Sequence, residues 1–180
     1  MTTSDLNFAA DHFALFDLAR AQTIDLPKLE EAFRAVQARV HPDRHAHGTA
    51  AERRLAMQWA TRANEAYQTL KSPLARARYL LGLLGHDAQV ESNTSMPGEF
   101  LMAQMELRET VGSAREADDE GVLDDIRGQL LAEMKYEYSR LEALIDTERN
   151  YPGATALVRQ LMFQEKLLFE IDEALDAVTA

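Results

Sequence analysis

Three histidines and an aspartate lie within seven residues in the first half of the chain, at His41, Asp43, His45 and His47. Imidazole nitrogens and carboxylate oxygens are common metal ligands, so this cluster could hold a metal ion that activates water. The spacing lacks a helical pair of histidines with a carboxylate positioned for catalysis, and the second half contains no histidine to complete the site. A helical metal-dependent enzyme is therefore an alternative, and we expect no metal and no cofactor.

The tripeptide His41-Pro42-Asp43 also stands in a short polar gap between two segments of helical periodicity. Pro42 lacks an N–H and disfavours the helical conformation of His41, so the first helix should end there. The sequence thus predicts a helical hairpin that displays the tripeptide at its turn. The apolar stripe before the gap is Leu29, Phe33, Val36 and Val40, and the stripe after it is Leu55, Trp59, Ala63, Tyr67 and Leu70.

Four segments of the chain carry a family resemblance. The stretches LEEAFRAVQARVHPDR and ANEAYQTLKSPLARARYLL resemble the J-domain over roughly residues 10–84. J-domains are helical hairpins whose HPD loop stimulates the ATPase of DnaK-type chaperones. The stretches FLMAQMELRE and LVRQLMFQEKL resemble the J-protein co-chaperones of iron–sulfur cluster biogenesis, the HscB type. The resemblance implies a non-enzymatic co-chaperone that binds an IscU-type scaffold protein, delivers it to an HscA-type chaperone and stimulates its ATPase. A general J-protein that serves a DnaK-type chaperone with other clients is the alternative within the class.

The predicted fold is all-α and has two domains. A polar stretch without helical periodicity near residues 87–98 separates a J-domain at 1–87 from a three-helix domain at 97–180, with a linker at 88–96. We expect an antiparallel bundle with helices over about 97–115 and about 120–147, then a break in the chain at Asn150, Pro152 and Gly153, and then a last helix. Ser95 is expected to cap the first of these helices and Pro97 to open it. A short helix after Pro73 is expected to join the domains through Tyr79, Leu80 and Leu83.

The resemblance also implies roles on the chaperone side. Asp43 would pair with an arginine of the chaperone, Pro42 would fix the loop and His41 would support it. The outward half of the preceding helix carries Lys28, Arg34 and Arg39, with Arg44 just beyond the tripeptide. Arg34 and Arg39 lie about 140° apart on a helical wheel, so they do not form one tight basic patch. Ordinary solubility is the alternative explanation of these basic residues.

The helix predicted from residue 97 has two apolar faces. Its core stripe is Phe100, Leu107, Val111 and Ala114, whereas Leu101, Met102 and Met105 form a second face flanked by Glu106 and Glu109. In the last helix Leu157, Leu161, Leu168, Ile171 and Leu175 point one way, and Phe163 lies over about 100° from their mean direction. By resemblance, the scaffold-binding positions are Leu101, Met102, Met105, Glu106, Glu109 and Phe163. Packing of this face against the J-domain is the alternative.

Composition restricts the partners. The net charge of −11 is uneven, because residues 1–86 hold 11 Lys and Arg against 9 Asp and Glu, and residues 87–180 hold 8 against 21. The acidic half argues against nucleic acid, whose binding depends on neutralising phosphates. The chain has no cysteine, which excludes disulfides and cysteine ligation of a metal or cluster. No apolar run approaches a membrane span, and no signal peptide opens the sequence, so we expect a bacterial cytoplasmic protein.

Overall fold

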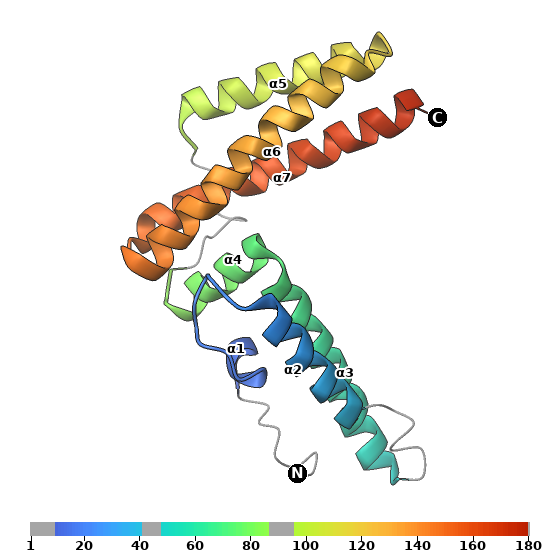
Figure 1. The fold of residues 1–180 in the computed structure, drawn as a ribbon, viewed down its shortest axis with the longest axis vertical. Coiled ribbons are helices and arrows are strands. Elements are labelled where there is room, and N and C mark those ends of the chain that lie inside the picture. Colours follow the sequence, from blue (N-terminus) through green and yellow to red (C-terminus); the bar gives the residue numbers. More distant parts are fainter. Residues whose placement is uncertain (1–9, 41–47, 87–95, 180) are drawn as a thin grey trace. The chain divides into compact units, whose positions relative to one another are not determined.

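A computed structural model of the chain describes residues 10–40, 48–86 and 96–179, and every regular element in these ranges is helical (Figure 1). The chain forms two compact units, Met1–Leu80 and Leu81–Ala180. The predicted all-α fold, a helical hairpin followed by a helical bundle, is confirmed. The predicted domain and linker boundaries stay a prediction. The helices are α1 (His12–Leu15), α2 (Leu26–Val40), α3 (Ala50–Lys71), α4 (Pro73–Leu83), α5 (Gly98–Glu116), α6 (Glu120–Glu142), a π-helical turn (Ala143–Thr147) and α7 (Tyr151–Thr179).

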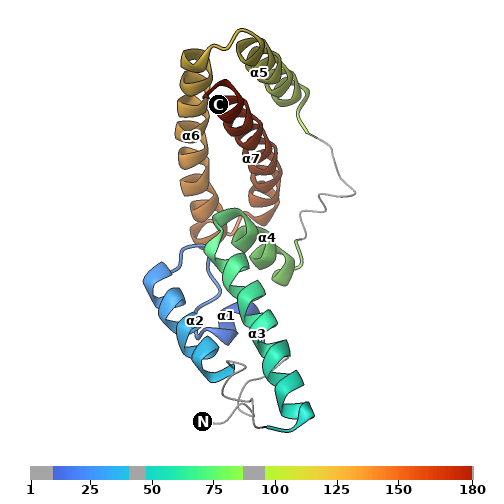
Figure 2. The ribbon, with the colours of Figure 1, turned by 90° about the vertical axis from the view of Figure 1, so that its right-hand side faces the viewer.

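The hairpin of the first unit consists of α2 and α3, which lie side by side in both views (Figures 1 and 2). On α2, Leu29, Val36 and Val40 are buried as predicted, and Phe33 is half-buried and stacks on Tyr67 of α3 at 4.1 Å between ring centres. The tripeptide that follows Val40 belongs to residues 41–47, which lie outside the described residues.

Helix α3 begins with a capping box. The Thr49 side chain accepts a hydrogen bond from the Glu52 backbone, and the Glu52 side chain accepts one from the Thr49 backbone. This reciprocal pair satisfies two of the N–H groups that a helix leaves free at its start. The stripe predicted on α3 is wrong at one position, because Leu55 is 37% exposed and Ala56 is buried in its place. Leu55 precedes Trp59 by four residues and Ala56 precedes it by three, so both lie near the buried face of α3. The structure turns Ala56 inward, which leaves Leu55 at the exposed edge of that face.

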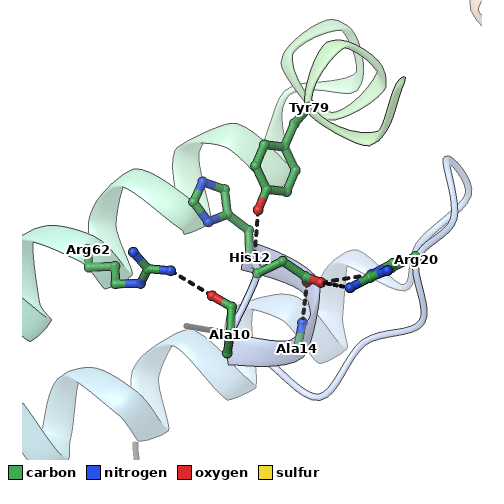
Figure 3. A network of polar contacts seen from close by, with 7 residues as sticks. Ala10, His12, Ala14, Arg20, Arg62 and Tyr79 are labelled. Atoms are coloured by element: carbon green, nitrogen blue, oxygen red, sulfur yellow. Dashed lines mark hydrogen bonds and ion pairs between the residues drawn. The ribbon is translucent and has the colours of Figure 1, made fainter. Parts of the chain in front are cut away.

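The short helix α1 is held by a polar network (Figure 3). Asp11 caps it by accepting from the Ala14 N–H at 2.9 Å, and Arg20 donates to the same carboxylate at 2.7 Å. Arg62 of α3 donates to the backbone carbonyl of Ala10 at 2.6 Å. Phe13 is fully buried beneath this network. Although burial acts to raise the pKa of Asp11, the hydrogen bonds from Ala14 and Arg20 outweigh it and lower that pKa.

Tyr79 of α4 joins this network from the other side. Its hydroxyl accepts a hydrogen bond from the His12 N–H at 3.0 Å, and its ring stacks on the His12 ring at 4.1 Å (Figure 3). The sequence analysis expected Tyr79 to join the domains, whereas these contacts tie α4 to α1 inside the first unit. Of the other two residues expected there, Leu80 is buried and Leu83 is 39% exposed.

The second unit is the bundle of α5, α6 and α7. The large apolar residues that recur along α6 and the π-helical turn are buried: Leu123, Ile126, Leu130, Met134, Leu141 and Ile145. Two side-chain contacts fix the antiparallel register of α6 and α7, with Arg127 donating to Asp172 at 2.7 Å and Tyr138 donating to Glu165 at 2.6 Å. The pairs Phe100–Phe163 and Arg108–Glu170 run in the same direction along α5 and α7, so these two helices are parallel.

The stripe predicted on α7 is partly wrong. Leu161 and Ile171 are buried, but Leu157, Leu168 and Leu175 are only half-buried. The buried face is rotated and contains two alanines and a glutamine: it comprises Ala154, Val158, Leu161, Gln164, Leu167, Ile171 and Ala174. A helix held between two neighbours turns small side chains toward the point of close approach, so the largest residues do not define its innermost face.

The ends of the bundle helices also differ from expectation. Asn150 caps α7 by accepting from the Gly153 N–H at 3.0 Å, and Pro152 and Gly153 lie inside the first turn instead of breaking the chain. Proline is tolerated in a first turn because its missing N–H has no helical partner there. Helix α5 begins at Gly98 with Pro97 as its N-cap residue, and Ser95 lies outside the described residues.

Removing the hydrogen bond from the His12 backbone N–H to the Tyr79 hydroxyl should cause a measurable loss of stability. Tyr79→Phe keeps the ring stacking but leaves the His12 N–H without its acceptor, so we expect the free energy of unfolding to fall by about 1 kcal/mol in urea denaturation. Tyr136→Phe is the matched control, because Tyr136 is 73% exposed and its change should have no effect. Equal stabilities of the two variants would contradict the importance of this bond.

The position of His12 predicts a dependence of stability on pH. Burial lowers the pKa of His12 and Arg62 acts in the same direction, while Glu65 and Asp11 oppose them. The folded state therefore binds this proton less readily than the unfolded chain, so the His12 contribution is complete above the ordinary pKa of 6.5 and is lost as the pH falls below it. Between about pH 7.5 and about pH 5.5, wild type should lose more unfolding free energy than His12→Phe. Parallel pH profiles of the two proteins would refute this.

Candidate functional site

The first half of α5 exposes large apolar side chains. Leu101 is 36% exposed, Met102 is 63% exposed and Met105 is 69% exposed. Glu106 and Glu109, which flank them, are also exposed. The second apolar face predicted for this helix therefore lies in solvent, as five of the six predicted scaffold-binding residues do. Adjacent exposed apolar side chains with a polar rim are typical of surfaces that bind another protein.

The buried face of α5 is narrow. Val111 and Ala114 are buried as predicted, but Phe100 and Leu107 are only half-buried. The remaining buried residue of α5 is Gln104, which is 5% exposed. Sequence reasoning missed Gln104, although its place four residues after Phe100 and seven before Val111 is a signal for an inward position. The fully buried face of α5 therefore holds only small or polar side chains, and its larger apolar residues stay at least partly exposed.

Phe163 behaves differently from the other predicted scaffold-binding residues. It is half-buried, and its ring meets the Phe100 ring edge-on with 6.1 Å between centres. The expectation that Phe163 points away from the main buried face of α7 is right, but its ring packs against α5 instead of standing free. A salt bridge from Arg108 to Glu170, at 2.8 Å, lies further along the same pair of helices. Phe163 thus both supports α5 and borders its exposed face.

A polar layer lies inside the bundle beside this face. Gln164, which follows Phe163, is 1% exposed, and its side chain acts on the half-buried carboxyl of Glu137 on α6, while one oxygen of each side chain is buried without a hydrogen-bond partner. Burial raises the pKa of Glu137, Glu133 raises it further, and the bond from Gln164 opposes them. Burying an incompletely paired carboxyl and amide costs free energy, so this layer makes the bundle less stable.

The basic residues predicted to meet a chaperone are less free than expected. Lys28 donates its Nζ to the backbone carbonyl of Asp17 at 3.1 Å. Arg34 lies 4.0 Å from Glu30 in an exposed pair one turn apart. Arg39 is half-buried instead of pointing outward. These three residues therefore form no common free surface on α2. Arg44 lies outside the described residues together with His41, Pro42 and Asp43.

Neither a metal-binding cluster nor a membrane-spanning helix occurs in the described part of the chain. In residues 10–40, 48–86 and 96–179, no group of three or more His, Asp or Glu side chains is placed to hold a metal ion. The histidine cluster at 41–47 falls outside these ranges, so the metal alternative for that cluster stays a prediction. None of the described helices has the length and hydropathy needed to cross a membrane.

Comparison with known proteins first defines the class, which is that of the J-domain co-chaperones. The fold matches a chaperone structure, HscB from Vibrio cholerae, with a TM-score of 0.82 and 35% identity over 94% of this chain and 99% of that one. It also matches human co-chaperone protein HscB with a TM-score of 0.86 and 25% identity, over 93% of this chain and 83% of that one.

The sequence narrows the class to one family. The chain is 51% identical to the co-chaperone protein HscB homolog of Ralstonia nicotianae over 95% of this chain and 98% of that protein. Residues 96–172 match the family described as the HSCB C-terminal oligomerisation domain. The chain belongs to the HscB family of co-chaperones. The Ralstonia and human relatives are both named as co-chaperones.

The exposure of α5 predicts how its variants behave. Leu101→Ala and Met105→Ala remove side chains that are largely in solvent, so each should change the free energy of unfolding by less than about 0.5 kcal/mol. Leu161→Ala, at a fully buried site of the same unit, should cost about 2–5 kcal/mol. Chemical denaturation of the three variants measures both effects. A loss of the larger size at Leu101 or Met105 would show that this face is part of the core.

Proposed function

We propose that this protein is a co-chaperone of iron–sulfur cluster assembly. Its bundle binds an IscU-type scaffold protein and brings it to an HscA-type chaperone, and the HPD loop stimulates ATP hydrolysis by that chaperone. The protein acts by bringing partners together and catalyses no reaction itself. In this proposal it works in the bacterial cytoplasm.

The exposed face of α5 is the observation that carries the proposal. A bundle helix needs one apolar face for packing, and α5 has a second one made of Leu101, Met102 and Met105. Methionine side chains are flexible and polarisable, which suits a surface that must fit a partner. Glu106 and Glu109 add negative charge at the edge of this face, so the partner surface should be apolar at its centre and basic at its border.

The chaperone-binding half of the proposal rests on family resemblance. In the sequence the tripeptide follows α2 directly and precedes α3. In the proposal the Asp43 carboxylate pairs with an arginine of the chaperone, because carboxylate–guanidinium pairs combine charge with directed hydrogen bonds. Lys28, Arg34, Arg39 and Arg44 contribute a diffuse positive field that favours encounter with an acidic chaperone surface.

The HPD loop is tested by Asp43→Asn. We expect this variant to lose stimulation of the chaperone ATPase in a steady-state assay, because the amide cannot form the charged pair. Its free energy of unfolding should stay within about 0.5 kcal/mol of wild type. Asp17→Asn is the matched control, because Asp17 has a φ of 52° that asparagine also adopts readily. Full stimulation by Asp43→Asn would refute the role of this loop.

The scaffold-binding face is tested by the double variant Leu101→Ala, Met105→Ala. Truncation of central interface residues weakens binding by about 1–2 kcal/mol each, so titration calorimetry should show scaffold affinity reduced by at least about tenfold. Val122→Ala is the control, since Val122 is an exposed apolar residue on another helix. Basal ATPase stimulation through the HPD loop should be unchanged. Retained affinity in the folded double variant would require another client site.

A further inference from the structure

A cavity of about 370 Å³, open to solvent, lies between the start of α5 and the first turns of α7. Its lining comprises Met96, Pro97, Ala156, Arg159 and Gln160. It lies near the lower end of the size range of ligand sites, which is about 300–1,000 Å³. A cavity of this size accommodates a side chain of a partner and leaves no room for a folded segment.

The cavity continues the face proposed for scaffold binding. Arg159 precedes Phe163 by four residues, so the two side chains lie about 40° apart on the same side of α7. Pro97 precedes Leu101 by four residues at the other wall. A protein that covers Leu101 and Phe163 therefore also reaches the mouth of the cavity.

Arg159 brings an unneutralised positive charge to this place. It is half-buried, and its Nε atom is buried without a hydrogen-bond partner. Arg108, further along the same surface, is paired with Glu170. In the described part of the chain no ion pair includes Arg159. Only the Nε atom of Arg159 is buried without a partner, so its other N–H groups can meet a carboxylate from a partner protein.

We propose that the cavity receives an acidic side chain of the scaffold protein and that Arg159 is its ionic partner. This inference rests on the proposed function and extends its binding face. The Arg159 guanidinium offers two parallel N–H donors to a carboxylate. Met96 and Pro97 provide an apolar wall for the methylene groups of the incoming acidic side chain. The bound scaffold protein then places an acidic residue at Arg159 and basic residues near Glu106 and Glu109. These two opposite charge contacts fix the direction in which the scaffold protein lies along α5.

The test is titration calorimetry of the full chain with an IscU-type scaffold protein. Arg159→Gln should weaken binding by about tenfold, because it removes one charged partner of a partly enclosed pair. Arg159→Lys should bind more tightly than Arg159→Gln, since it keeps the charge but lacks the two parallel donors. Arg115→Gln is the matched control, an exposed arginine of the same unit whose loss should change affinity by less than about twofold.

A second variant tests the cavity without touching its charge. Ala156 is exposed at the cavity wall, and Ala156→Leu narrows the cavity on a helix position that tolerates leucine. It should weaken scaffold binding as Arg159→Gln does, and it decides the question if Arg159→Gln fails to fold. Wild-type affinity in both Arg159→Gln and Ala156→Leu would overturn the proposal.

Double-mutant cycles identify the acid and separate the two proposals. Each exposed Asp or Glu of the scaffold protein is changed to its amide and titrated against wild type and Arg159→Gln. One acid should weaken binding to wild type and have no further effect on Arg159→Gln. If no acid couples to Arg159, the cavity does not bind a scaffold carboxylate, although scaffold binding itself stands. If wild type does not bind the scaffold protein, the proposed function fails before the cavity is tested.

Discussion

The limited area that α5 can bury against α6 and α7 determines which of its apolar side chains stay exposed. A helix that packs on two neighbours turns one face inward, and on α5 that face holds Gln104, Val111 and Ala114. The larger apolar residues Leu101 and Met105 are thereby left in solvent. Phe100 and Leu107 are half-buried, and the Phe100–Phe163 ring contact and the Arg108–Glu170 salt bridge also join α5 to α7. The same geometry leaves one face of α5 available for the scaffold binding proposed above.

Charge supports a division of labour between the two halves of the chain. Residues 1–86 are nearly balanced, whereas residues 87–180 carry 8 basic and 21 acidic residues. Each unit has its own means of stability: the first uses the network around His12 and Tyr79, and the second uses the stripe of α6 with its bridges to α7. Separate cores allow each unit to present a surface to a different partner. In the acidic unit, the half-buried Arg159 gives a binding face a direction that a uniformly acidic surface lacks.

The sequence was sufficient for the helices, the hairpin and the second apolar face of α5, because apolar spacing of three and four residues is a direct consequence of helical geometry. The same spacing matches the buried face of α6, because the inward residues of that helix are all large and apolar. It was insufficient for α7 and for Leu55, because close contact between helices favours alanine at positions where a hydropathy pattern favours leucine. Gln104, Gln164 and Arg159 were missed for a related reason, since a polar residue in a helical pattern is read as exposed. The HPD loop was recognised by resemblance, and its roles stay predictions.

The central claim is that one chain couples a client to a chaperone through two surfaces. The most direct measurement is the steady-state ATPase rate of the HscA-type chaperone with this protein alone, with an IscU-type scaffold protein alone, and with both. The account predicts that the rate with both far exceeds the sum of the separate stimulations, because binding to one chain raises the local concentration of client at the chaperone. A rate equal to that sum would contradict the account, because the two surfaces would then act independently.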